Sequence, residues 1–478
     1  MTPSNVESYS NPLLERYASA EMARIFSARF KFETWRRLWL WLAEEEKRLG
    51  LPIPEQALVE MRGSLGQIDF EAAAREEEKT RHDVMAHIRV FGHAAPAAKG
   101  IIHWGATSAF VADNGDLIQM REALSLSEKR LVEVLKRLRA FALAHRDLPV
   151  LAYTHFQPAQ PTTVGKRAAM WSADLLFDLE ALRAARANLR FLGAKGATGT
   201  QASFLSLFDG DSSRVEELDR ALAARAGFEK RVAVSGQTYS RKQDDMVLHA
   251  LSGLAQSAHK IGTDLRLLQH DGEIEEPSES TQVGSSAMPH KKNPMRAERI
   301  CALARHVIAL SLDTAMTAAT QWLERSLDDS ANKRIAVPEA FLAADAILLL
   351  LENVAGGLVV HPDVCRRRLE AELPFLATEE ILMEAVRRGG DRQQLHERLR
   401  LHARASSEKR AKDGEPADLL GRIARDPAFG LTPEDAARAA RPERLVGRAA
   451  EQVEIFVREE LDPALQGVAE TEAAEIRV

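Results

Sequence analysis

The chain has 478 residues, enough to bury a large hydrophobic core and to form about three domains. Its net charge of −6, with 28% charged residues, argues against non-specific nucleic-acid binding, which needs an excess of basic side chains. No stretch approaches about 18 uncharged apolar residues, and the two cysteines make neither a disulfide framework nor a metal motif. The first residues lack the basic-then-apolar pattern of a secretory signal. We therefore expect a cytoplasmic protein that neither binds nucleic acid nor spans a membrane.

Residues 1–107 are predicted to form a mixed helical N-terminal domain. Short runs of like charge, such as Glu44–Glu46, are typical of solvated helix faces, and we interpret this run in that way.

Residues 108–360 are predicted to form a central domain of long helices, because proline is absent from 97–148, 162–276, 295–337 and 339–361. Apolar residues recur there at helical spacing. The three clearest series are Leu117, Met120, Leu124, Leu131, Leu135, Leu138; Val164, Ala168, Trp171, Leu175, Leu179, Leu182; and Met246, Ala250, Leu254, Ala258, Ile261, Leu265, Leu268. Such long helices with one apolar stripe must pack against others, which predicts a bundle that oligomerises.

Residues 361–478 change to shorter, arginine-rich amphipathic segments interrupted by prolines, which predicts a C-terminal helical domain. The fold class is therefore all-α, with three domains.

Three polar segments interrupt the helical pattern and are predicted to be loops, where binding and catalysis concentrate. They are GATSAFVADNGD (105–116), THFQPAQPTTVGKR (154–167) and GSSAMPHKKNP (284–294). In the third segment, Lys291 and Lys292 are suited to binding a carboxylate or phosphate. A nearby ammonium group or backbone N–H groups could activate the Ser285 hydroxyl as a base, but a solvated surface loop has the same composition.

His155, in the second segment, is a candidate acid because histidine titrates near neutrality. The chain has 14 histidines, and a lone histidine is more often structural than catalytic. Its neighbours Thr154, Gln157 and Gln160 nevertheless offer more hydrogen-bonding groups than a buried structural histidine needs.

GSSAMPHKKNP resembles the GSSxMPxKxNP signature of the fumarase/aspartase superfamily of lyases at every fixed position. Further segments resemble the longer variety of the adenylosuccinate lyase family within it, from about residue 10 to residue 460. They are RYASAEM (16–22), TRHDVMAH (80–87), THFQPAQPTTVGKR, KGATGTQASF (195–204), SGQTYSRK (235–242), QWLERSLDDSANKR (321–334) and GRAAEQV (447–453). One mild departure is His290, where some relatives carry tyrosine.

The resemblance implies a β-elimination that releases fumarate from adenylosuccinate and from the succinyl-carboxamide ribotide of purine synthesis. It implies that Ser285 is the base on a mobile loop and that His155 is the general acid. Lys291 would hold the succinyl carboxylate and favour the serine alkoxide, with help from Asn293, and His82 would support the acid.

Matching positions also imply the substrate contacts. Thr107 and Ser108 would bind the succinyl carboxylates, and Gln237 the substrate. The implied nucleotide contacts are Arg16, Tyr17, Arg81, Asp83, Arg299, Arg325, Ser330 and Arg334. For arginines such as Arg325 and Arg334, a surface ion pair is the alternative interpretation.

Family members are homotetramers with a shared core of roughly 20 helices, and three subunits contribute to each active site. The sequence has no P-loop and no HExxH motif, and Gly193, Gly196 and Gly199 do not have GxGxxG spacing, so no metal or organic cofactor is implied. An argininosuccinate lyase, a carboxymuconate cycloisomerase or a non-catalytic protein of the same fold remain alternatives. A phosphate requirement would separate the first two from the nucleotide enzyme.

Overall fold

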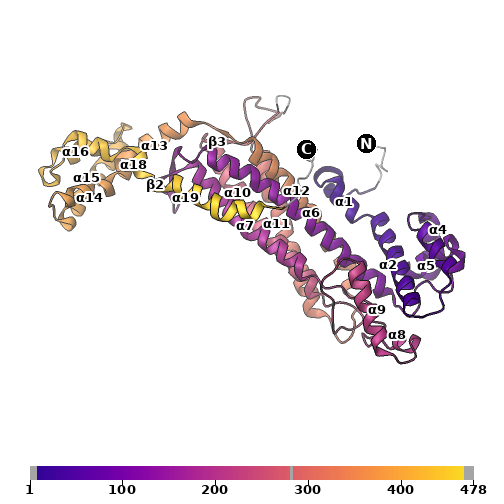
Figure 1. Ribbon diagram of the computed structural model, residues 1–478. Coiled ribbons are helices and arrows are strands. Elements are labelled where there is room, and N and C mark those ends of the chain that lie inside the picture. The colour runs from indigo at the N-terminus through magenta and orange to yellow at the C-terminus, as the bar shows by residue number, and fades with distance from the viewer. Residues whose placement is uncertain (1–7, 280–281, 283, 468–478) are drawn as a thin grey trace.

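The computed structural model describes residues 8–279, 282 and 284–467 and shows an elongated molecule (Figure 1). The N-terminal part packs short helices around α2 at one end. Its elements are η1 (Leu13–Tyr17), α1 (Ala20–Ile25), α2 (Ala28–Arg48), α3 (Glu55–Gly63), α4 (Phe70–Thr80), α5 (Asp83–Ala94) and η2 (Pro96–Ala98). Serine starts two of these helices: the Ser19 and Ser27 hydroxyls accept hydrogen bonds from the backbone N–H groups of Met22 and Phe30.

The interpretation of Glu44–Glu46 as a solvated face is wrong for two of its three residues. Glu45 and Glu46 on α2 are 4% and 0% exposed. Glu45 meets Arg48 and Arg225, which explains its burial, whereas no partner for the Glu46 carboxylate occurs among the described residues. Charge alone therefore did not identify the outer face of this helix.

Five long helices form the central bundle. They are α6 (Ser108–Ala144), α7 (Val164–Asn188), α10 (Lys242–His270), α11 (Met295–Thr320) and α12 (Asp329–Gly357). Their packing buries the three apolar series that the sequence placed on helix faces, apart from Met246. The first polar segment was predicted as a loop, but Ser108–Asp116 form the opening turns of α6. Its polar residues lie inside a helix because several are buried against ion-pair partners rather than solvated.

Two small two-stranded sheets accompany the bundle, and the first is a hairpin. The strands β1 (Pro149–Thr154) and β2 (Gln157–Thr163) pair antiparallel, so most of the second polar segment is a strand, not a loop. His155 and Phe156 turn the chain with φ of 52° and 56°, the backbone of a tight two-residue hairpin turn. The strands β3 (Ile274–Glu275) and β4 (Val359–Val360) also pair, and they join the end of α10 to the end of α12.

The C-terminal part begins with α13 (Pro362–Leu376) and has a small core of its own, which includes Ile381, Leu395 and Phe429. Its further elements are α14 (Thr378–Arg387), α15 (Arg392–Asp413), α16 (Leu419–Arg425), η3 (Pro427–Phe429), α17 (Pro433–Ala439) and α18 (Pro442–Leu445). The chain then returns to the bundle as α19 (Ala449–Phe456), η4 (Val457–Leu461) and α20 (Asp462–Leu465). Figure 1 shows α19 in yellow beside α7.

Among the described residues, α11 is the one helix whose length and apolar composition would allow it to cross a bilayer. In the structure it packs against α10 and α12, and Ile300, Ala304 and Val307 are fully buried there. Its composition is therefore that of a bundle-core helix.

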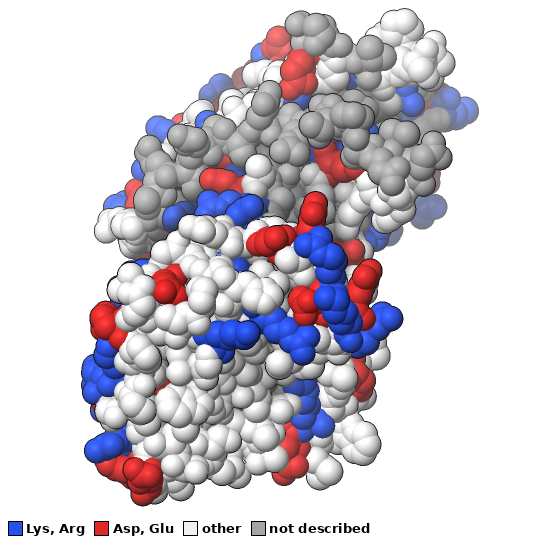
Figure 2. Space-filling view, turned by 90° about the vertical axis from the view of Figure 1, so that its right-hand side faces the viewer, with Lys and Arg blue, Asp and Glu red and all other residues white. Residues whose placement is uncertain are grey.

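Figure 2 shows the face at the N-terminal end of the molecule. Basic and acidic side chains alternate over the middle of this face, and the lower half is largely uncharged.

Candidate active site

A cavity of about 590 Å³ lies where the N-terminal helices meet the starts of α6 and α12. Seven of the residues singled out by the motifs line it, from three separate segments: Arg81, His82, Asp83, Ser108, Arg325, Ser330 and Arg334. This convergence of distant segments is what a binding site requires and what scattered surface arginines would not produce.

Local backbone geometry places the first segment. Arg81 ends α4 in the left-handed region, with φ of 52°, and this turn directs the chain into α5. His82 caps α5, and its Nδ1 accepts a hydrogen bond of 3.4 Å from the Met85 N–H. Asp83 forms an ion pair of 3.3 Å with Arg334 of α12 across the cavity.

Two glycines bring the next segments together. A Cβ on Gly199 would lie 1.8 Å from the carbonyl oxygen of Ser235, so the two backbone segments pack more closely than any side chain on residue 199 would permit. Gly236 packs in the same way against the carbonyl of Glu324. This close packing places the side-chain amide of Gln237 beside Arg325. The Nη1 of Arg325 donates a hydrogen bond of 2.7 Å to the Oε1 of Gln237.

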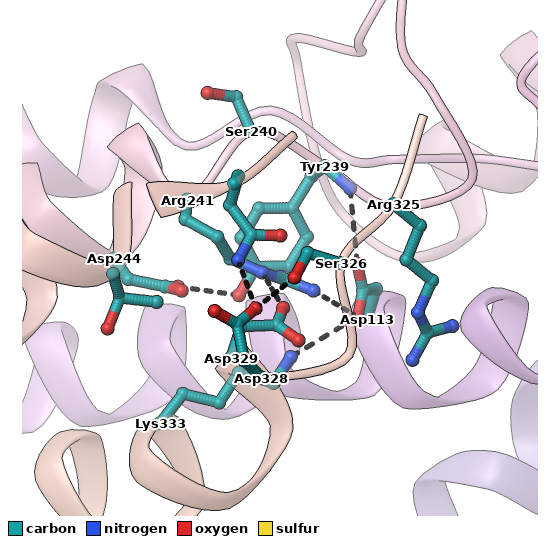
Figure 3. A network of polar contacts seen from close by, with 12 residues as sticks. Asp113, Tyr239, Ser240, Arg241, Asp244, Arg325, Ser326, Asp328, Asp329 and Lys333 are labelled. Carbon is teal, nitrogen blue, oxygen red and sulfur yellow. Dashed lines mark hydrogen bonds and ion pairs between the residues drawn. The ribbon is translucent and has the colours of Figure 1, made fainter. Parts of the chain in front are cut away.

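An ion-pair network forms the deep wall of the cavity (Figure 3). Asp113 of α6 accepts from the Tyr239 backbone N–H at 3.1 Å, from Arg241 at 3.2 Å and from Lys333 at 3.2 Å. Burial alone would raise the pKa of Asp113, but Lys333 and Arg241 outweigh it and hold that pKa below its ordinary value. Asp113 is therefore an ionised anchor between α6 and α12.

Burial raises the pKa of the Asp244 carboxyl in this wall to about 6. The Tyr239 hydroxyl donates to it at 2.5 Å. Burial also raises the pKa of Tyr239 well above its ordinary value, so this hydroxyl stays protonated as a donor.

The sequence analysis did not single out these wall residues or Lys31. Asp113 and Tyr239 lie inside quoted motifs, and for Asp113 a charged residue within the apolar pattern of a long helix was the available signal. Lys31 lies on α2, outside every motif, and its ammonium group lines the cavity above the Trp35 ring at 4.8 Å. Burial lowers the pKa of Lys31.

Five predicted residues are not among those that line this cavity: Arg16, Tyr17, Thr107, Gln237 and Arg299. Gln237 reaches it through Arg325, and Thr107 precedes the first turn of α6. Tyr17 ends η1, and the Arg299 guanidinium stands over its ring at 5.5 Å. Arg16 is its neighbour on η1.

The signature loop lies elsewhere. The Ser285 hydroxyl accepts hydrogen bonds from the backbone N–H groups of Ala287, at 3.3 Å, and Met288, at 3.0 Å. Asn293 donates to the carbonyl of Gly284 at 2.7 Å and folds the loop on itself. Lys291 and Asn293 line a second, smaller cavity of about 280 Å³.

His155 is exposed at the tip of the β1–β2 hairpin, which lies beside α13 and α18, away from the N-terminal helices (Figure 1). Between Ser108 at the cavity and Ala144 just before this hairpin runs the whole of α6, which is about 54 Å long at 1.5 Å per residue. One chain therefore does not bring His155 together with Ser108.

Comparisons with known proteins agree with the motifs. Residues 67–309 match the family described as Lyase, and residues 374–456 match the family described as Adenylosuccinate lyase C-terminus. The adenylosuccinate lyase of Saccharomyces cerevisiae is 50% identical over 463 residues, 96% of each chain. That of Schizosaccharomyces pombe is 48% identical over 461 residues, again 96% of each chain. This chain belongs to the adenylosuccinate lyase family.

The fold is also that of a solved structure, the 3-carboxy-cis,cis-muconate lactonizing enzyme from Pseudomonas putida. Its TM-score is 0.82 at 24% identity, over 95% of this chain and all of that one. At this identity the likeness concerns the fold alone. The family and the predominantly helical fold that the sequence predicted are confirmed.

Proposed function

We propose that the protein is a carbon–nitrogen lyase of purine nucleotide biosynthesis that removes fumarate from adenylosuccinate, leaving AMP. It would act in the same way on the succinyl-carboxamide ribotide. The cavity carries this proposal, because three arginines, Ser330 and the His82–Asp83 pair line one space large enough for a nucleotide. Membership of the adenylosuccinate lyase family supports it independently.

In the proposed reaction, Ser285 removes the succinyl Cβ proton and generates an aci-carboxylate. The two N–H groups that point at its hydroxyl favour the alkoxide form. Lys291 neutralises the developing charge on the carboxylate, and Asn293 keeps the loop folded. The C–N bond then breaks, its electron pair leaves with nitrogen, and the Cα–Cβ double bond of fumarate forms.

His155 is the proposed general acid that protonates the departing nitrogen, and His82 supports it. Thr107 and Ser108 are proposed to bind the succinyl carboxylates. The proposed nucleotide and substrate contacts are Arg16, Tyr17, Arg81, Asp83, Gln237, Arg299, Arg325, Ser330 and Arg334.

The active site is proposed to assemble from several subunits of a homotetramer. The length of α6 supports this, because it keeps the His155 hairpin far from the cavity within a chain. Apolar side chains on the outside of the bundle also support it: Phe177, Leu312 and Met316 are 70%, 64% and 63% exposed. Five long helices from each of four subunits would form the shared core of roughly 20 helices.

The cytoplasm is the proposed compartment. Cys301 and Cys365 are both unpaired thiols, which suits a reducing environment.

Incubation of the purified protein with adenylosuccinate tests the activity, with fumarate and AMP identified by mass spectrometry. Release of both products at equal rates is expected, and Ser285→Ala should fold normally and lose most turnover. The matched control is Ser286→Ala on the same loop, which should keep activity. A folded protein that releases neither product contradicts the proposal, and argininosuccinate and carboxymuconate are then the substrates to try.

A further inference from the structure

The hairpin that carries His155 needs support from the rest of the protein. It has only two strands, and an isolated two-stranded hairpin is marginally stable in water. Its inner face packs on α13, where Leu151 joins a small apolar cluster with Leu369, Leu373 and Leu376. Apolar packing of this kind holds the strand down but leaves its position along the helix loosely defined.

A buried carboxylate lies beneath the same strand. Glu273, between α10 and β3, is fully buried, and its two oxygens face two arginines. Its Oε1 lies 3.3 Å from Nε of Arg368 on α13, and its Oε2 lies 4.0 Å from Nη1 of Arg167 on α7. Three elements of the fold thus meet at one carboxylate.

Each of these arginines uses a second nitrogen to contact β1. Arg368 Nη2 donates to the Tyr153 hydroxyl at 3.0 Å, and Arg167 Nη2 donates to the carbonyl of Leu151 at 3.0 Å. The two contacts are two residues apart along β1, and His155 follows two residues later. Arg368 also pairs with Asp271 at 2.9 Å, which ties it to the end of α10.

The charges in this group depend on one another. Burial raises the pKa of the Glu273 carboxyl, and the two arginines oppose that effect. Loss of either arginine leaves the carboxylate short of a counter-charge, so the group responds as a unit. A planar guanidinium is also the group that can bind the carboxylate and the strand simultaneously, which an ammonium cannot do as well.

We propose that Glu273, Arg167 and Arg368 form a clamp that fixes the β1–β2 hairpin and thereby positions His155 for proton transfer. The clamp residues are positioning residues, because the two arginines contact the strand and Glu273 contacts the arginines. This inference rests on the proposed role of His155 as the general acid. A misplacement of about 1 Å in a catalytic group can cost roughly 100-fold in rate.

Kinetics of Arg368→Met test the clamp in the whole enzyme. We expect kcat to fall by about 10- to 100-fold, while KM changes by less than roughly threefold, because Arg368 contacts Tyr153, Asp271 and Glu273 and none of these is a proposed nucleotide contact. Arg368→Lys should recover part of the loss. Arg366→Met is the matched control, since Arg366 is an exposed arginine of the same helix paired with Asp363.

Hydrogen exchange of the same variants gives a readout that does not depend on activity. In Arg368→Met, backbone amides of residues 150–163 should exchange at least about 10-fold faster, whereas peptides from α6 and α10 stay protected. An unchanged hairpin, or faster exchange throughout the bundle, overturns the clamp. If the unaltered protein releases no fumarate, the proposed function fails, but the exchange result still decides whether the clamp holds the hairpin.

Discussion

Gly236 lies so close to Glu324 that a Cβ on the glycine would stand 2.2 Å from the glutamate's carbonyl oxygen. The same oxygen accepts the backbone N–H of Gln237 at 3.0 Å. This contact between two loops sets the spacing at which Gln237 meets Arg325, and Arg325 lines the cavity.

Gly236→Ala should therefore separate these loops. A methyl group cannot occupy that space, so the backbone must shift, and we expect a loss of about 1–3 kcal/mol in stability. Turnover should fall by roughly 100-fold, since Arg325 moves with its loop. Gly100→Ala is the control, because a Cβ there meets no atom within 4 Å. Unchanged kinetics in Gly236→Ala would show that the loops tolerate separation.

Arg334 is predicted to recognise the phosphate of the nucleotide. Its Nη2 forms an ion pair of 3.3 Å with Asp83, which holds Arg334 at the cavity. A bound phosphate can compete there with Asp83 for the guanidinium. In Arg334→Met, calorimetry should show AMP binding weakened by about 10- to 100-fold, and the binding of adenosine, which lacks the phosphate, little changed. Equal losses for both ligands would assign Arg334 a structural role.

Glu46 should make stability depend on pH. Burial raises the pKa of its carboxyl from the ordinary value of 4.5 to about 9. Between these two values the folded chain holds a proton that the unfolded chain has released, so stability falls as pH rises. The loss should approach ~6 kcal/mol at the top of this range.

Glu46→Gln removes this titration. Denaturant unfolding between pH 5 and 9 should show a flatter profile for the variant than for the unaltered protein. Parallel profiles would mean that Glu46 finds a partner in the folded protein.

A mixture of two inactive variants tests the shared site. Ser285→Ala and His155→Ala should each lose most turnover alone. If one site takes Ser285 and His155 from different subunits, some sites of mixed tetramers contain neither substitution. Co-expressed, doubly tagged tetramers should therefore regain turnover, and separately purified variants assayed individually should not. Absence of recovery in tetramers shown to contain both chains would contradict a site shared in this way.

Much of the fold followed from the sequence because long helices have strong periodic signals. The series through Leu117 and Leu138 lies on one helix as predicted, and proline marked the change to short segments after residue 361. The predictions of secondary structure were wrong where polar side chains form ion pairs inside the fold. Ser108–Asp116 looked like a loop because their polar side chains bind partners from distant segments, which local composition does not reveal.

The cavity was predictable only in part. Motif residues such as Arg81 and Arg334 converge there, and the quoted motifs supplied them. Lys31 was not predicted as a cavity residue, because the sequence of α2 does not distinguish it from a surface lysine. Its contact with the ring of Trp35 is known only from the structure. The clamp on the hairpin was not predicted either, because Glu273, Arg167 and Arg368 are far apart in sequence and meet only in the folded chain.

The uninterrupted α6 helix also restricts which changes in length the family can accept. One residue inserted near its middle would advance everything beyond it by about 1.5 Å and rotate it by roughly 100°, which turns buried leucines to solvent. An insertion of seven residues restores the direction in which the side chains face but lengthens the helix by about 10 Å. Every neighbouring helix must then lengthen equally. Insertions and deletions should therefore accumulate in segments such as the loop at 414–418, between α15 and α16, and the span between the two ends of the bundle should be inherited as a fixed length.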